Sequence, residues 1–202
     1  MSGLMHRLVI LWFIVYMTAS FSSRALAQAN AAIDVEVKAT LIQPPTSCSV
    51  ATSTPSTDLE FGTIAPPSSG NDQWVDVDEV DGTVSTSPNI ADPTDHMVGG
   101  ISIQALNSNS LTVSVTFPSD LDNAAGPSYT KLSYTGAWAV SSTSTSGYTT
   151  ISGTSDTQSS LGGVGGSATR YYRFGGEVSD IGDTTPEDTY DGTIDLSISC
   201  SL

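Results

Sequence analysis

Cysteine, histidine and carboxylate side chains are the groups in this chain of 202 residues whose types and spacing could support chemistry. There are two cysteines, Cys48 and Cys200, and their thiols could bind a metal or form a disulfide. Only one histidine, His96, follows residue 27, and two cysteines with one histidine cannot complete a zinc site. A disulfide between Cys48 and Cys200 is therefore the expected chemistry if the chain is exported to an oxidising compartment.

An acidic run from Asp76 to Gly82 is the best candidate for a metal site. An EF-hand loop takes ligands from its first, third and fifth positions, has glycine at the sixth and glutamate at the twelfth. Here Asp76 and Asp78 fit the first two ligand positions, but Asp81 and Gly82 come one residue late and a serine replaces the glutamate. Alternation with valines favours an exposed strand face, so Asp76, Asp78 and Asp81 are only weak calcium candidates.

No motif indicates catalysis. His96 lies near Asp92 and Asp95, but no G-x-S-x-G nucleophile elbow occurs in the chain. The spacing of carboxylates leaves a glycosidase pair open, because such partners meet only in the fold. The Gly162–Gly166 run has no lysine and no strand–helix setting, so a phosphate loop is not indicated. We expect a non-enzymatic protein with no cofactor.

The first 27 residues have the pattern of a signal peptide. His6 and Arg7 precede an apolar run, and Ala25–Ala27 forms a small-residue cleavage site. A membrane anchor is the alternative, but the run is shorter than the roughly 18–20 residues that a span requires. We therefore expect a signal peptide over 1–27, one domain over 28–202, no membrane segment after cleavage, and export to the periplasm, the cell surface or the medium.

The charge balance limits the partners. The chain carries 21 acidic and 6 basic residues, for a net charge of −15. Beyond residue 27 the only cations are Lys38, Lys131, Arg170 and Arg173. Binding to nucleic acid requires a basic patch, and so does binding to an anionic membrane surface. Both are therefore excluded as expected partners.

Apolar and polar residues alternate in much of the chain, which is typical of strands with one buried face. The pattern predicts strands over 33–41, 58–64, 73–80, 99–106, 111–117, 132–140, 170–178 and 189–200, and a short one that resumes at Cys48 after Pro44–Pro45. Ser141–Gly166 is predicted as a long hairpin or flexible loop. The fold class is all-β, an immunoglobulin-like Greek-key sandwich of about 7–9 strands, with a closed barrel as the alternative.

The last predicted strand gives the clearest alternation. Ile194, Leu196, Ile198 and Cys200 fall on one face, so a bond to Cys48 would lie at the edge of the core and join the first and last strands. Tyr171, Tyr172 and Phe174 form an aromatic cluster, which either packs in the core or forms an exposed platform for sugars.

Two segments carry a resemblance to a known group of proteins. Asp58–Ile64 reads DLEFGTI, and Tyr190–Ile198 reads YDGTIDLSI. Together with the leader, the early strand and Cys48, they are similar to bacterial secreted β-domains related to spore-coat U proteins and, more distantly, to type 1 fimbrial subunits. The resemblance covers nearly the whole chain after residue 27. It implies a pilin-like fold and a structural or adhesive role outside the inner membrane.

The chain departs from the fimbrial pattern in two ways. Its second cysteine, Cys200, lies in the last strand, whereas fimbrial subunits pair two cysteines in the first half. Only Gln28–Ala32 would precede the first strand, which is short for an arm that donates a strand to a neighbour. We expect a secreted structural or adhesive surface protein, a pilus-like or coat subunit that associates with itself or with other surface subunits. The alternative is a monomeric extracellular module that binds carbohydrate or another ligand.

Overall fold

The chain is all-β in the part that the computed structural model describes, residues 33–42, 48–52, 58–70, 72–123 and 131–202. Within these residues it forms thirteen strands and no helix, which confirms the all-β part of the predicted fold class. The expected signal peptide, the segment 28–32 and the Pro44–Pro45 break lie outside the described residues. In chain order the strands are β1 (Ile33–Ile42), β2 (Cys48–Thr52), β3 (Leu59–Ile64), β4 (Gln73–Val77), β5 (Val84–Thr86), β6 (Gly99–Leu106), β7 (Ser110–Thr116), β8 (Asp120–Asn123), β9 (Lys131–Ser141), β10 (Thr149–Thr150), β11 (Ser155–Ser159), β12 (Ser167–Ile181) and β13 (Thr189–Ser201).

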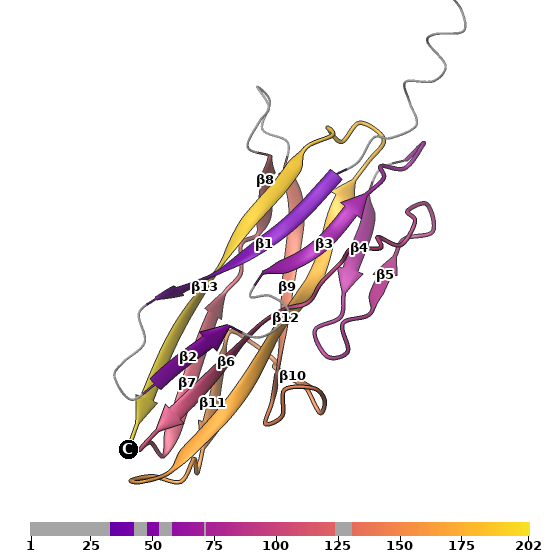
Figure 1. Ribbon diagram of the computed structural model, residues 1–202. Helices are drawn as coiled ribbons and strands as arrows, with labels where there is room; N and C mark the ends of the chain where they lie inside the picture. Colours follow the sequence, from indigo (N-terminus) through magenta and orange to yellow (C-terminus); the bar gives the residue numbers. More distant parts are fainter. Residues whose placement is uncertain (1–32, 43–47, 53–57, 71, 124–130) are drawn as a thin grey trace, which may run out of the picture. The chain divides into compact units, whose positions relative to one another are not determined.

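The strands are hydrogen-bonded into one curled, mixed sheet (Figure 1). Its main path runs β11-β7-β13-β8-β9-β12-β4-β5, with β1 and β3 joined at β13, β2 and β6 at β12, and β10 at β9. Among the described strands, β1 with β13 is the one parallel pair. The short strand β8 pairs with β13 through Tyr190 and Asp191 and with β9 through residues 131–133. It therefore connects β13 to β9 within the sheet.

The predicted number of strands, about seven to nine, is too low. The additional strands β5, β8, β10 and β11 have only two to five residues, which is too short for a period of two to be recognised. Two of them lie in Ser141–Gly166, where a hairpin or loop was expected. β10 does form a hairpin with β9, but β11 pairs with β7, so this segment crosses between strands that are distant in the sequence.

The closing strand β13 has the predicted buried face. Ile194 and Leu196 are fully buried and Ile198 is nearly so, while Asp195 and Ser197 between them are exposed. β1 pairs along Thr189–Ser197 on one side, and β7 pairs along Asp195–Ser201 on the other. The end of the described chain is therefore a central strand of the sheet.

A β-bulge in β3 explains why its apolar residues share one face despite uneven spacing. Val35 of β1 lies opposite Gly62, but Glu36 lies opposite Glu60, so Phe61 is the extra residue. Gly62 has a φ of 78°, a left-handed conformation that favours glycine. The inserted residue shifts the alternation, and as a result Ile64 joins Leu59 and Phe61 in the core.

Aromatic side chains fill much of the core. The rings of Trp138 in β9 and Tyr172 in β12 stack with centroids 5.7 Å apart, and both residues are buried. Phe174 is also fully buried, whereas Tyr171, on the other face of β12, is half-buried. Packing is therefore the correct interpretation for Tyr172 and Phe174, and these two aromatics do not form an exposed sugar platform.

Candidate functional site

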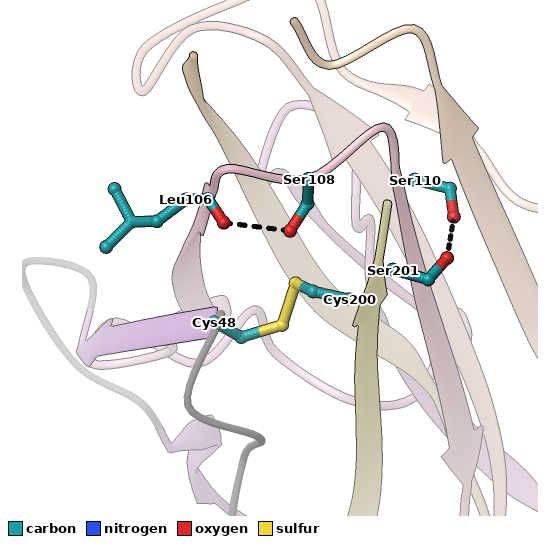
Figure 2. The surroundings of a disulfide bond; sticks show 6 residues. All are labelled: Cys48, Leu106, Ser108, Ser110, Cys200 and Ser201. Atoms are coloured by element: carbon teal, nitrogen blue, oxygen red, sulfur yellow. Dashed lines mark hydrogen bonds between the residues drawn. A yellow bond between two sulfur atoms is a disulfide. The ribbon is translucent and has the colours of Figure 1, made fainter. Parts of the chain in front are cut away.

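The structure joins Cys48 of β2 to Cys200 of β13 in a disulfide, with Cα atoms 5.9 Å apart (Figure 2). Cys48 is buried and Cys200 half-buried, so the bond lies at the edge of the core. Among the described strands, β2 pairs only with β6, and β13 pairs with β1, β7 and β8. The disulfide therefore links two strands that share no ladder of hydrogen bonds.

Polar contacts surround this link. The Ser201 backbone oxygen accepts a hydrogen bond of 2.7 Å from the Asn109 N–H, and the hydroxyls of Ser110 and Ser201 lie 2.7 Å apart. In the same turn the Ser108 hydroxyl donates to the Leu106 carbonyl at 2.9 Å (Figure 2). The two bonds of Ser201 hold the end of β13 against the β6–β7 turn, and the Ser108 bond lies within that turn. The role of the two cysteines is structural, because their sulfurs are bonded to each other and neither is a free thiol.

The three aspartates of the calcium hypothesis serve different roles. The Asp78 Oδ1 accepts hydrogen bonds from the N–H groups of Val80 (2.7 Å) and Asp81 (3.0 Å). The Asp81 Oδ1 accepts from the N–H and hydroxyl of Thr83, and these bonds lower the pKa of the Asp81 carboxyl. Both side chains therefore shape the β4–β5 turn. The described residues contain no group of three histidine, cysteine or carboxylate side chains placed to hold a metal ion.

Asp76 differs from the other two because it lies within β4. Its partner across the strands is Glu177 of β12, so two acidic residues lie directly opposite each other. Burial raises the pKa of Asp76 to about 6, and the negative charges of Glu177, Asp78 and Glu79 add to the shift. Like charges in directly opposed positions destabilise a strand pair. Asp76 consequently takes up a proton at a higher pH than an ordinary aspartate.

His96 and its neighbouring aspartates are engaged separately. The His96 Nδ1 lies 2.9 Å from the Pro93 carbonyl, to which the ring N–H donates. Asp95 accepts from the Thr63 N–H at 2.9 Å, and Asp92 accepts from the Thr86 hydroxyl at 2.8 Å. The two aspartate bonds fix the loop before β6 to β3 and β5, and the His96 bond lies within the loop. The loop role that the sequence indicated for His96 agrees with this geometry.

A polar groove is the feature that the sequence did not indicate. It has a volume of about 320 Å³ and is formed by the end of β9, the loop that follows it, β11 and β12. Its lining includes Val140, Ser142, Gly147, Thr149, Gln158 and Arg170. Most of these residues come from Ser141–Gly166, where the sequence pattern predicted only a hairpin or a loop.

A chain of hydrogen bonds organises one wall of this groove. The Tyr172 hydroxyl donates to Asp156 Oδ2 at 2.9 Å, and the Gln158 amide donates to both Asp156 oxygens at 3.1 and 3.0 Å. The Arg170 Nε then donates to the Gln158 Oε1 at 3.1 Å, and its Nη1 donates to the Thr169 carbonyl at 3.0 Å. Burial raises the pKa of Tyr172, and the Asp156 charge adds to this, so the phenol stays protonated as a donor.

Comparisons with known proteins do not assign this arrangement to a family. No protein-family model matches the chain, and no curated protein matches it. The described residues contain no helix that is long and apolar enough to cross a membrane.

Proposed function

We propose that this protein is a secreted, non-enzymatic structural or adhesive protein of the bacterial cell surface, with a pilin-like immunoglobulin fold. The observation that carries the proposal is the closing strand. β13 has β1 on one side and β7 and β8 on the other, and the Cys48–Cys200 disulfide fixes its end. Such a disulfide is compatible with an exported protein, because oxidising compartments are where these bonds persist.

The grouping of the strands supports a Greek-key sandwich as the finer fold. β3, β1, β13, β7 and β11 form one group, β2, β6, β12 and β9 form another, and β8 connects them. Tyr172 and Phe174 of β12 belong to the same hydrophobic cluster as Ile194 and Leu196 of β13. Two hydrogen-bonded groups that share one core are the basis of a sandwich.

The pairing of β1 with β13 bears on how a surface subunit would assemble. Strand addition requires an open edge beside the receiving strand. Along Thr189–Ser197 the edge of β13 is already paired with β1 of the same chain. Assembly through this position would require β1 to be displaced. We therefore propose that self-association or association with other surface subunits does not insert a strand beside β13 along Thr189–Ser197.

Fractionation of the native host tests export and assembly together. We expect the protein in the periplasmic, surface or extracellular fraction, with Cys48 and Cys200 joined under non-reducing mass spectrometry, and in assemblies by size-exclusion chromatography with light scattering. Cytoplasmic protein with two free thiols would overturn the proposal of a secreted protein. A stable, strictly monomeric exported protein would overturn the subunit role and leave the binding module.

The second candidate, a monomeric extracellular module that binds carbohydrate or another ligand, is favoured by one observation. The groove beside Arg170 offers hydroxyl groups of Ser142 and Thr149 together with a guanidinium group. Groups of this kind bind the hydroxyls and charges of polar ligands. An adhesive protein and a binding module could both use such a groove.

A further inference from the structure

The groove lies where the core faces of two strands become polar. In β11, Asp156 and Gln158 pair with Val113 and Leu111 of β7, which are fully buried. On the opposite face of the same strand pair, threonine and serine hydroxyls bond across the strands at 3.1 and 3.2 Å. Asp156 and Gln158 are half-buried, whereas the other residues of β11 are exposed. These two side chains therefore continue the inner face of the β7–β11 pair.

Arg170 occupies the corresponding position in β12. It precedes Tyr172 and Phe174 by two and four residues, so it lies on their face of the strand. Its partner across the ladder in β6 is Ile103, which is fully buried. A half-buried arginine on a core face requires a reason, because charged groups are rarely placed there without a partner.

No carboxylate among the described residues forms a salt bridge with Arg170. Lys38 pairs with Glu36 at 3.1 Å, and Lys131 pairs with Asp122 at 2.9 Å. Gln158 stands between Arg170 and Asp156, with its amide donating to the carboxylate and its oxygen accepting from the guanidinium. The neutral Gln158 side chain thus positions the guanidinium and leaves its charge available in a protein whose net charge is −15.

We infer that this groove binds the carboxylate of an acidic sugar, a uronic acid unit, with Arg170 as the anion-binding group. The guanidinium fork matches a carboxylate in two parallel hydrogen bonds. Nε and one bond of Nη1 are used by Gln158 and Thr169, and the described residues offer Nη2 no acceptor. The inference deepens the binding-module alternative and rests on it.

The remaining lining favours a sugar over a peptide. Ser142 and Thr149 contribute hydroxyls, Gly147 leaves the loop backbone accessible, and Val140 is the one apolar side chain in the lining. The lining lacks the apolar walls that bury most of an apolar ligand, and its hydroxyl and amide groups are donors and acceptors that match the hydroxyls of a sugar. The volume of about 320 Å³ is at the lower end of ligand pockets, which suits one or two sugar units.

The loop that closes the groove is preorganised for this role. The Ser141 hydroxyl donates to the Ser146 carbonyl at 2.7 Å and accepts from the Thr143 N–H at 3.1 Å. Gly147 has a φ of 73°, which turns the chain back toward β10. These bonds fix the loop before any ligand arrives, so little conformational entropy is lost on binding.

Titration of the ¹⁵N-labelled protein, expressed with its own leader and purified from the exported fraction, tests the inference by NMR. D-Galacturonate and D-galactose are a matched pair, since they differ at C6 by a carboxylate in place of a hydroxymethyl group. We expect galacturonate to shift the amide signals of Ser142, Gly147 and Thr149 with a millimolar Kd. Galactose and acetate should each bind at least tenfold more weakly.

Three variants complete the test. Arg170→Gln should weaken galacturonate binding at least tenfold, and Arg170→Lys, which keeps the charge but loses the fork, at least threefold. Lys131→Gln removes the same unit of charge at the other end of β9 and should bind like the unchanged protein. If Arg170→Gln does not fold, Arg170→Lys decides the matter.

Several results would overturn the inference. Equal binding of galacturonate and galactose would exclude the carboxylate as the recognised group. Equal binding of acetate would exclude the sugar, and displacement of galacturonate by equimolar sulfate would indicate a general anion site. Unchanged binding by Arg170→Lys would show that the two parallel hydrogen bonds of the guanidinium group are not needed to bind the carboxylate. None of these results bears on the proposal that the protein is exported. That proposal is overturned only if the protein is cytoplasmic with free thiols.

Discussion

Replacing Cys48 and Cys200 together by alanine is expected to lower the free energy of unfolding by about 3–5 kcal/mol. The disulfide joins residues that are 152 positions apart, so it closes a loop over nearly the whole described chain. In the chain-entropy model a loop of this length removes about 17 cal/mol/K from the unfolded state, which is about 5 kcal/mol at 25 °C. Residual structure in the unfolded chain reduces this figure, hence the lower bound.

The loss should be global and not limited to one end of the sheet. Cys48 belongs to β2 and Cys200 to the central strand β13, and no ladder of hydrogen bonds joins these strands. Cutting the bond frees β2 to separate from β13 in the unfolded ensemble while leaving every ladder intact in the folded one. The effect therefore acts mainly through the unfolded state.

Urea unfolding of the oxidised protein and of the double variant measures the difference. With an m-value of about 2.5 kcal/mol/M, the midpoint should fall by about 1–2 M. Reduction of the unchanged protein should give the same shift. Ser201→Ala is the control, because it removes an exposed hydroxyl beside Cys200, and it should change stability by less than about 0.5 kcal/mol. A midpoint shift below about 0.3 M for the double variant would refute the entropy argument.

Three further substitutions and one control substitution test the packing and the charges of the sheet. Asp76→Asn should stabilise the protein by about 1 kcal/mol at pH 7.5, a figure discounted for partial exposure. The raised pKa means that the folded state favours the protonated carboxyl, so the stability that protonated Asp76 gives the unchanged protein is present below pH 4 and lost as pH rises through about 6. Thermal melts should therefore show a gain for Asp76→Asn at pH 7.5 and none at pH 4. Gly175→Ala should destabilise by about 2 kcal/mol or more in urea unfolding, because a Cβ there would collide with the Val77 carbonyl, and a near-neutral result would show that β4 can shift. Leu196→Ala should cost about 2–5 kcal/mol by the same assay, whereas Ser197→Ala, which is exposed, should stay within about 0.5 kcal/mol.

The alternating strands were predictable because each one carries its own evidence. In β13 every second residue from Ile194 is apolar, and burial follows the pattern position by position. The cysteine pair was predictable for a different reason, since only two thiols were present to combine. Both inferences use local information or simple counting, and neither requires knowledge of which strands are neighbours.

The pairing of the strands could not be predicted from the sequence. β11 lies beside β7, whose paired residues come 41 to 49 positions earlier, and nothing in the TSDTQSS segment indicates this partner. The bulge at Phe61 is also invisible in the alternation, because it adds one residue to β3 and depends on the register with β1. Register between distant strands is decided by tertiary contacts, which local propensity does not encode.

One signal in the sequence could have indicated the groove. Arg170 has the same parity as Tyr172 and Phe174, and a strand that places these aromatics in the core must direct the arginine toward the same side. A charged residue in register with core residues predicts either an internal partner or a ligand at the point where the core ends. Gln158 supplies only a neutral contact, and no salt bridge to a described carboxylate completes the pairing. The mismatch between parity and polarity in β12 is therefore the feature of the sequence on which the proposed binding site depends.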